Sequence, residues 1–266
     1  IEADLTISRT GEEEFYIVTG SAFGVHDRSW IEKHSPRDGS VVIDDLTEEF
    51  GVINLCGPHA RDVLQNVTDD DISNETLPFS SYADIRVAGH PVRAMRIGYV
   101  GELGWEMHMG RENMPSVYKA LAEAGSQYDI ADAGYRAIDS LRMEKGYLYW
   151  SSDISPDYNP FEAGLGFRVN MKKGDFIGRD ALNAIKENGE PERKIAYFTL
   201  EKYMPVYGSE PIMREGRILD VTTSANFGYT IGKPLVFGYL PVQEFENRNF
   251  SVEAFGEIVP ATRHDG

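Results

Sequence analysis

The sequence predicts an α+β fold in two parts: helices and mixed antiparallel sheets over residues 1–190, then a small β barrel over residues 191–266. Helical and strand-like patterns alternate along the first part, whereas from residue 192 onward only short strands separated by turns remain. Several short strands at regular spacing are typical of a small barrel or sandwich. The polar link "KENGEPERK", residues 186–194, contains Gly189 and Pro191 and marks the boundary.

The first part opens with a predicted hairpin. Its strands are "ADLTISR" and "EFYIVTG", residues 3–9 and 14–20, joined by "TGEEE". The stretch "RSWIEKHS" around Trp30 predicts the last turns of a helix. Two further strands are expected at "SVVIDDL" and "GVINLCG", residues 40–46 and 51–57.

Helices and a second hairpin are expected next. Pro58 can begin a helix through residues 59–67, because proline is tolerated in a first helical turn. Residues 81–99 predict a hairpin that turns at Gly89-His90-Pro91. Residues 113–125 carry apolar side chains at helical spacing and Gly125 can close that helix, while another helix is expected over residues 131–147.

The charge balance argues against two classes of partner. The chain has 43 acidic and 26 basic residues, a formal net charge of -17, which repels nucleic-acid phosphates and anionic lipid. We therefore expect no nucleic-acid partner and no membrane partner, and no run of 18 apolar residues is present. The single cysteine, Cys56, cannot form an internal disulfide and is expected as a small buried side chain. This composition suits the cytoplasm or, in a eukaryote, the mitochondrial matrix.

Metal, nucleophile and nucleotide motifs are missing from the sequence. The six histidines are scattered without ligand spacing, so we expect no metal site and histidines on the surface or at helix caps. The patterns Gly-x-Ser-x-Gly, Gly-x-Gly-x-x-Gly and Gly-Lys-Ser/Thr do not occur. The chain itself therefore shows no site for FAD, NAD or ATP.

Carboxylates are the remaining candidates for chemistry. Asp4 lies early in a predicted strand, where it would share a face with Glu2 and oppose Leu5. A carboxylate on an inward face needs a partner or a substrate. The alternative is an aspartate at a strand edge or turn, and the pattern alone leaves both open.

A second candidate is the stretch "GYVGELGWEMHM", residues 98–109. Gly101 and Gly104 permit a tight irregular turn that could bring Tyr99 and Glu106 into one pocket. A glutamate can accept two parallel N–H bonds from an aminopyrimidine edge, and a tyrosine can stack on a flat ring. The alternative is an ordinary turn in which Trp105 is buried.

Several motifs together resemble the glycine-cleavage T-protein (aminomethyltransferase) family over nearly the whole chain. The details are more similar to the folate-binding half of dimethylglycine and sarcosine dehydrogenases and oxidases. The motifs occur in the family's order: "IEADLTISR", "GYVGELGWE", "AGYRAIDSLRMEKG", "NPFEAGLGF", "DFIGRDAL" and "VTTSANFGYTIGKPLVFGYLP". The resemblance implies a T-protein-like folate-binding fold followed by a β barrel, and a chain that begins inside the family's fold.

The resemblance also implies an activity. Tetrahydrofolate would accept the carbon released by oxidative N-demethylation of dimethylglycine or sarcosine, giving 5,10-methylenetetrahydrofolate. FAD would be supplied only by a separate or missing domain, so a flavoprotein domain or subunit is an expected partner beside the small-molecule substrate and folate. The alternatives are a folate-dependent O- or S-demethylase of the same fold and a non-catalytic binding or assembly module.

Five residues correspond to positions that the family uses. Asp4 matches the aspartate near the reacting nitrogens of folate, where it would act as a base or stabilise positive charge. Tyr99 and Glu106 match the tyrosine and glutamate around the pterin, and Phe167 stands where the T-protein has a tryptophan. Ile138 replaces the arginine that contacts the folate tail in the T-protein proper, which favours the dehydrogenase-like branch. Arg142 matches a second arginine with a structural role.

Overall fold

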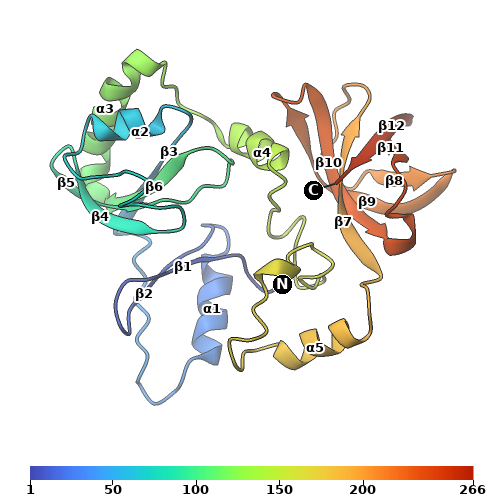
Figure 1. Ribbon diagram of the computed structural model, residues 1–266, viewed down its shortest axis with the longest axis horizontal. Coiled ribbons are helices and arrows are strands. Elements are labelled where there is room, and N and C mark those ends of the chain that lie inside the picture. Colours follow the sequence, from blue (N-terminus) through green and yellow to red (C-terminus); the bar gives the residue numbers. More distant parts are fainter. Residues whose placement is uncertain (266) are drawn as a thin grey trace. The chain divides into compact units, whose positions relative to one another are not determined.

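The computed structural model describes residues 1–265, and these form two compact units. The sheet unit is Leu5–Ile138, and the barrel unit is Ile1–Asp4 together with the chain from Asp139 onward (Figure 1). The division falls inside helix α4 (Tyr135–Glu144), so one helix contributes to both units. The domain boundary predicted between residues 190 and 191 is not tested by this division and stays a prediction.

The sheet unit contains a hairpin, a four-stranded antiparallel sheet and three helices before α4. In chain order its elements are β1 (Thr6–Arg9), β2 (Phe15–Val18), α1 (Gly24–His34), β3 (Phe50–Cys56), α2 (Ala60–Gln65), β4 (Tyr82–Val87), β5 (His90–Met95), β6 (Gly104–Gly110), the 3₁₀ turn η1 (Arg111–Asn113), α3 (Met114–Gly125) and the 3₁₀ turn η2 (Ser126–Tyr128). Both expected hairpins, β1–β2 and β4–β5, are confirmed. The strand order of the larger sheet is β3-β6-β5-β4.

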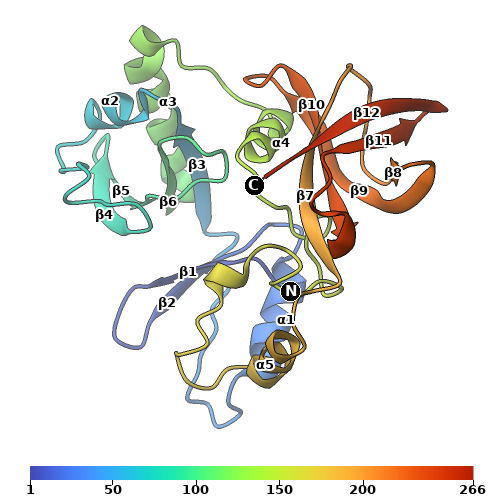
Figure 2. The same ribbon diagram turned by 45° about the vertical axis from the view of Figure 1, so that its right-hand side comes forward.

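The core of the sheet unit lies between the four-stranded sheet and helices α2 and α3, which run beside it in Figures 1 and 2. Strand β6 alternates strictly: Trp105, Met107 and Met109 are buried in this core, while the residues between them lie on the other face. Leu64 of α2 and Leu121 of α3 pack into the same core. The helical spacing predicted both helices, although Tyr118, at the same spacing in α3, is 47% exposed.

One expectation about the sheet unit is wrong. No strand forms over residues 40–46, because Asp45 accepts a hydrogen bond from the backbone N–H of Thr47 and this local turn replaces a ladder. Val42 consequently stays 79% exposed. By contrast, helix α3 ends at Gly125, as expected, and a Cβ at this position would lie 2.7 Å from Ile130.

Turn positions also differ slightly from expectation. The β4–β5 hairpin turns at Ala88 and Gly89, both with positive φ, and not at Gly89-His90-Pro91. His90 already pairs with Val87 across the strands. A two-residue turn with positive φ matches the right-handed twist of the flanking strands, which explains the shift.

The barrel unit contains a closed six-stranded barrel, as the sequence predicts. Its strands are β7 (Arg193–Leu200), β8 (Pro211–Arg214), β9 (Arg217–Gly228), β10 (Lys233–Pro241), β11 (Asn249–Ala254) and β12 (Glu257–His264), in the closed order β10-β7-β12-β11-β8-β9. All pairs are antiparallel, and the barrel is filled by buried side chains such as Phe198, Val236 and Val259. Closure leaves no open sheet edge. The 3₁₀ turn η3 (Gly166–Arg168) and helix α5 (Arg179–Glu187) precede the barrel.

Helix α4 is shorter than the expected span of residues 131–147. It ends in a Schellman motif, in which the N–H of Tyr147 bonds to the carbonyl of Arg142 and the N–H of Gly146 bonds to that of Met143. Gly146 has a φ of +76°, which other residues rarely adopt. The helix therefore stops where glycine permits the chain to turn.

Candidate functional site

Glu106 is the third residue of β6, in the middle of the four-stranded sheet. It lies opposite Asn54 of β3 and Met95 of β5. Its side chain is 18% exposed. Within residues 1–265 the carboxylate has a single ion-pair contact, to the Nε2 atom of His108 at 3.6 Å. A carboxylate that is largely withdrawn from water normally accepts several hydrogen bonds, so Glu106 retains capacity for donors from a ligand.

The segment before β6 explains how Glu106 is placed. After β5 the chain runs irregularly through Tyr99, which is half-buried, and Gly101 has a φ of +73°. At Gly104 a Cβ would lie 2.4 Å from the backbone oxygen of Leu55, so only glycine allows β3 and β6 to approach there. Trp105 is fully buried, as the alternative interpretation of this stretch expected. That burial leaves Glu106 available, because neighbouring strand residues point to opposite faces.

His108 shares the face of β6 that carries Glu106 and was not recognised from the sequence. Its side chain is 2% exposed, so the expectation that all six histidines are surface or capping residues is wrong for this one. Tyr16 of β2 hydrogen-bonds to the Nδ1 atom of His108 at 3.1 Å, and the two rings meet edge to face. The spacing Gly104-Glu106-His108 was the available signal, since a period of two puts these residues on one face.

Arginine and tyrosine side chains surround this pair of residues. The guanidinium of Arg93 lies 5.1 Å from the ring centres of both Tyr16 and Tyr82. It also makes a two-pronged contact with the carboxylate of Asp84, at 2.8 and 3.0 Å. Burial raises the pKa of Tyr16, and Arg93 opposes that rise. The phenol therefore keeps its proton and can act as a donor.

Asp4 lies in the barrel unit, not in a strand. The strand begins at Thr6, so the argument that Asp4 and Glu2 share a strand face is wrong. The segment before Asp4 is held by the indole N–H of Trp150, which donates to the carbonyl of Ile1 at 3.2 Å. The Asp4 side chain is exposed, yet burial by surrounding atoms raises the pKa of its carboxyl. A raised pKa suits a group that exchanges a proton.

Phe167 lies in η3, also in the barrel unit. Its side chain is 75% exposed, and the guanidinium of Arg168 lies 4.9 Å from the ring centre. The structure thus places Tyr99 and Glu106 in one continuous segment of the sheet unit and assigns Asp4 and Phe167 to the barrel unit. A common site formed by all four residues stays a prediction.

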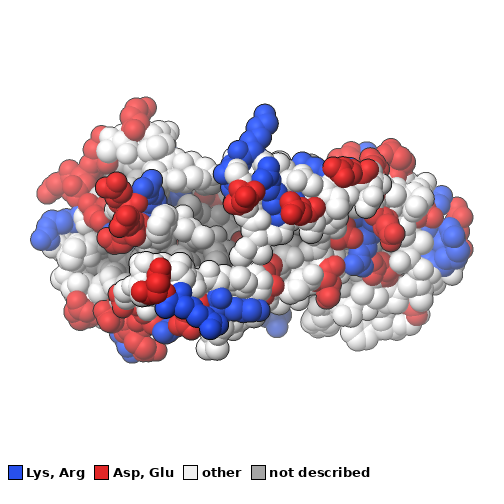
Figure 3. Space-filling model, turned by 90° about the horizontal axis from the view of Figure 1, so that it is seen from below, with Lys and Arg blue, Asp and Glu red and all other residues white. Residues whose placement is uncertain are grey.

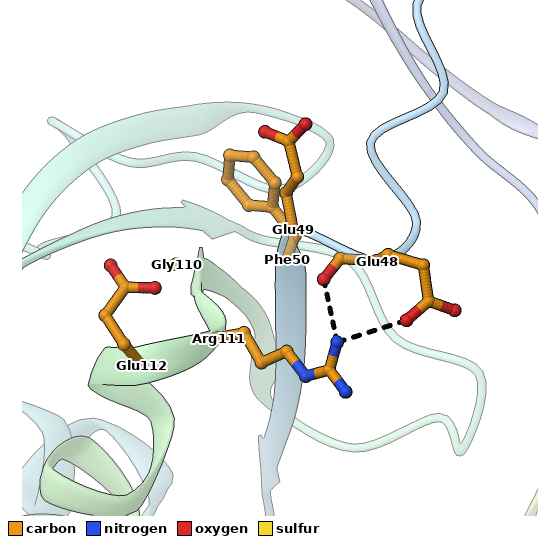
Figure 4. Close-up of a pocket in the computed structure, with 6 residues that line it drawn as sticks. All are labelled: Glu48, Glu49, Phe50, Gly110, Arg111 and Glu112. Atoms are coloured by element: carbon orange, nitrogen blue, oxygen red, sulfur yellow. Dashed lines mark hydrogen bonds and ion pairs between the residues drawn. The ribbon is translucent and has the colours of Figure 1, made fainter.

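Two open hollows lie in the sheet unit among others, and neither of these two is lined by a predicted site residue. One, of about 600 Å³, is lined by Glu48, Glu49, Phe50, Gly110, Arg111 and Glu112 (Figure 4). Arg111 donates to the backbone and side-chain oxygens of Glu48, so its charge is already paired and the hollow stays acidic. Such a hollow does not suit an anionic ligand. The second, of about 590 Å³, is lined by His108, Arg93 and Asp84 among others.

The barrel unit contains a buried charged network around Arg142. This side chain is 3% exposed and donates to Asp139 at 2.8 Å, to Asp153 at 2.7 Å and to Ser224 at 2.7 Å. Asp153 is fully buried and also accepts the backbone N–H of Tyr149. The network joins α4 to the barrel strand β9, which confirms the structural role expected of Arg142.

Other expectations concern Cys56, metals and membranes. Cys56 is exposed, not buried, because it follows the inward Leu55 on β3 and points to the opposite face. In the part of the chain that the structure describes, no group of three or more His, Cys, Asp or Glu side chains could hold a metal ion. None of the described helices is long and apolar enough to cross a membrane. Acidic and basic side chains are interspersed over the face drawn in Figure 3.

Comparison with known protein families identifies the family to which this fold belongs. The family model of the GCVT N-terminal domain matches residues 1–173, and that of the glycine cleavage T-protein C-terminal barrel domain matches residues 193–266. The chain belongs to the glycine-cleavage T-protein family. The crystal structure of the glycine cleavage system aminomethyltransferase T from Bartonella henselae matches 100% of the chain and 71% of its own, with a TM-score of 0.83 and 24% identity. This confirms the predicted fold class.

Curated relatives of the chain within this family include enzymes of two kinds. It is 39% identical to the mitochondrial dimethylglycine dehydrogenase of Mus musculus over 98% of the chain and 30% of that protein. It is 39% identical to the mitochondrial sarcosine dehydrogenase of Homo sapiens over 90% of the chain and 28% of that protein. An aminomethyltransferase of Symbiobacterium thermophilum is 33% identical over 90% of the chain and 64% of that protein. The chain therefore spans about three tenths of the length of these dehydrogenases.

Proposed function

We propose that this chain performs tetrahydrofolate-dependent one-carbon transfer and forms 5,10-methylenetetrahydrofolate. The carbon would come from oxidative N-demethylation of dimethylglycine or sarcosine at a flavin site outside this chain. Membership of the T-protein family and similarity to dimethylglycine dehydrogenase, sarcosine dehydrogenase and aminomethyltransferase support an enzymatic role of this kind.

The observation that carries the proposal is the state of Glu106. Its carboxylate is four-fifths buried and has one contact at 3.6 Å within the described chain. The 2-amino group and the neighbouring ring N–H of a pterin offer two parallel donors, which a carboxylate accepts well. Glu106 is therefore the ligand for that edge, with Tyr99 and Phe167 as aromatic surfaces for the pterin or its linker.

Asp4 takes the role of proton carrier in this proposal. Tetrahydrofolate supplies the two nitrogen atoms that accept the carbon when it is bound. Burial raises the pKa of the Asp4 carboxyl, so it holds a proton more readily than an ordinary aspartate does. As a carboxylate it would also stabilise positive charge on the reacting group.

The flavin would be bound by another domain or subunit. The dehydrogenase relatives are more than three times as long as the matched region, so they have room for such a domain. We place the folate-binding part at residues 1–190 and the barrel part at residues 191–266. The relatives named mitochondrial support a matrix location in a eukaryote, and a bacterial protein of this kind would be cytoplasmic.

Titration calorimetry with 5-formyltetrahydrofolate, a stable reduced folate, tests the binding step on the purified full-length protein. Glu106→Gln is expected to weaken binding by about 10- to 100-fold, because it removes a charged acceptor. The control is Glu75→Gln, an exposed glutamate of the sheet unit whose replacement should leave affinity unchanged. Equal affinity of the Glu106→Gln variant and the wild-type protein would contradict the proposed site.

The reaction is tested by mass spectrometry of the folate product. With the flavoprotein that oxidises the amine present, methylenetetrahydrofolate formed from dimethylglycine or sarcosine supports the proposal, whereas 5-methyltetrahydrofolate formed from a methoxy or sulfonium compound would indicate an O- or S-demethylase. Absence of any reduced-folate binding would favour a non-catalytic binding or assembly module. Asp4→Asn should abolish most of the transfer while leaving folate binding largely intact, because it keeps the side chain's size and removes its charge.

A further inference from the structure

Strand β6 carries two ionisable side chains on one face, Glu106 and His108. His108 is 2% exposed, so its ring is withdrawn from water and its two nitrogens depend on partners within the protein. Nδ1 has one: the hydroxyl of Tyr16, at 3.1 Å. Nε2 has no hydrogen bond of ordinary length in the described chain and faces the Oε2 atom of Glu106 at 3.6 Å.

The Tyr16 hydroxyl can donate to or accept from Nδ1, and the negative charge of Glu106 beside Nε2 favours the arrangement in which the hydroxyl donates and Nε2 carries the hydrogen. If the imidazole is neutral, Nδ1 accepts the phenolic proton and Nε2 bears the hydrogen that faces the carboxylate. If the imidazole is protonated, both nitrogens bear hydrogen and Nε2–H still faces the carboxylate. The opposite tautomer would point a nitrogen lone pair at the negative charge of Glu106, which is unfavourable.

We propose that His108, held by Tyr16, is a positioning residue whose Nε2–H orients the carboxylate of Glu106 for the N–H edge of a pterin. This inference rests on the proposed function of Glu106 as the pterin ligand. The chain of contacts runs from β2 through β6, both in the sheet unit. When one donor holds a carboxylate, its remaining lone pairs point in a fixed direction. Less side-chain entropy is then lost when a ligand binds.

Neighbouring charges support this arrangement. Arg93 lies opposite His108 on β5, but its guanidinium is committed to both oxygens of Asp84 and to the faces of Tyr16 and Tyr82. It therefore leaves the Glu106 carboxylate to His108. The distance of 3.6 Å is long for a hydrogen bond, and such contacts often shorten when a ligand binds.

Nuclear magnetic resonance of the ring nitrogens tests the first half of the inference without any folate. In the wild-type protein Nε2 of His108 should carry hydrogen and Nδ1 should not, or both should be protonated. Glu106→Gln should move the Nε2 resonance more than the Nδ1 resonance. A neutral ring with its hydrogen on Nδ1 would overturn the proposal, because Nε2 could then donate nothing to Glu106.

Calorimetry with 5-formyltetrahydrofolate tests the second half through a matched pair of variants. His108→Gln can put an amide N–H near the position of Nε2, whereas His108→Asn reaches only the position of Nδ1. We expect about 10-fold weaker binding for His108→Asn and a recovery to within about 3-fold of wild type for His108→Gln. A purely structural role would not separate the two amides in this order.

Tyr16→Phe and His59→Phe complete the series. Tyr16→Phe removes the hydroxyl that hydrogen-bonds to Nδ1 and should weaken binding by about 3-fold, while His59→Phe, at an exposed histidine of the same unit, should leave binding unchanged. Tight folate binding by wild type and by His108→Asn alike would overturn the positioning role and leave the proposed function standing. No folate binding by the wild-type protein would overturn both.

Discussion

Asp153 and Glu106 are both carboxylates withdrawn from solvent, and they differ in how many donors surround them. Asp153, in the barrel unit, accepts hydrogen bonds from Arg142, the Tyr149 backbone, Thr223 and Ser224. Glu106, in the sheet unit, has a single ion-pair contact within residues 1–265, from its Oε2 atom to Nε2 of His108 at 3.6 Å. Satisfied buried charges specify a structure, whereas a carboxylate with unused acceptor capacity is available to a ligand.

Because the numbers of donors differ, Asp153 and Glu106 should contribute differently to the stability of the folded protein. Removing Asp153 would leave Arg142 as a buried cation with fewer acceptors, which is costly in a low-dielectric interior. Removing the charge of Glu106 breaks no hydrogen bond of ordinary length within the described residues, so the folded state should lose little. The comparison therefore predicts large stability effects in the barrel unit and mainly binding effects at β6.

The largest expected effect is that of Asp153→Ala. We expect it to lower the free energy of unfolding by about 3–5 kcal/mol, because it breaks a buried ion pair and leaves several donors unsatisfied. Urea denaturation followed by circular dichroism measures this change. Asp157→Ala, at an exposed aspartate nearby in sequence, is the control and should change stability by about 0.5 kcal/mol or less. A loss below about 1 kcal/mol for Asp153→Ala would show that the network is not a stabilising one.

A change at Gly104 tests how β6 is placed. Gly104→Ala should lower the free energy of unfolding by about 1–3 kcal/mol, because the new Cβ would lie 2.4 Å from the Leu55 backbone oxygen and force β3 and β6 apart. Thermal unfolding of the variant measures the loss. Gly24→Ala is the matched control, since nothing lies within 4 Å of a Cβ there. If the two variants were equally stable, the close strand approach would not matter.

Glu106→Gln tests the other half of the comparison, namely that Glu106 contributes little to the free energy of unfolding. Its free energy of unfolding should stay within about 1 kcal/mol of wild type, because the amide keeps the shape of the side chain and the carboxylate had no close hydrogen bond to lose. The measurement is the same urea titration. A loss comparable with that of Asp153→Ala would make Glu106 part of the scaffold and weaken its assignment as a ligand residue.

The smallest expected effect concerns Asp4 and pH. Because burial raises the pKa of Asp4 above its ordinary 3.8, the carboxyl contributes stability that is fully present below that value and lost as the pH rises through the higher folded pKa. Asp4→Asn should therefore gain stability relative to wild type as the pH rises from about 3 to 7. The gain should be roughly 0.5 kcal/mol or less, since the side chain is exposed and screened. Unfolding curves at several pH values would show it, and an opposite trend would mean that the carboxylate is stabilised by a partner.

The periodic parts of the chain were predictable and the irregular parts were not. The hairpins, the helices α2 and α3 and the barrel followed from local spacing and turn residues. The strand expected at residues 40–46 failed because Asp45 offers the backbone a local turn. The stretch around Gly101 was recognised as a glycine-rich turn, but no strand was predicted over Gly104–Gly110, where β6 forms.

Sequence alone determined the α+β class and the family, because these depend on residue order and local pattern, and it proposed Asp4, Tyr99, Glu106 and Phe167 as candidates. Tertiary structure alone decided that Tyr16, ninety-two residues away along the chain, meets His108, and that Asp153 is enclosed by donors from β9. Such contacts join segments that local propensity cannot connect. They form because burying apolar neighbours draws the polar groups out of water, and each group must then find a partner in the fold.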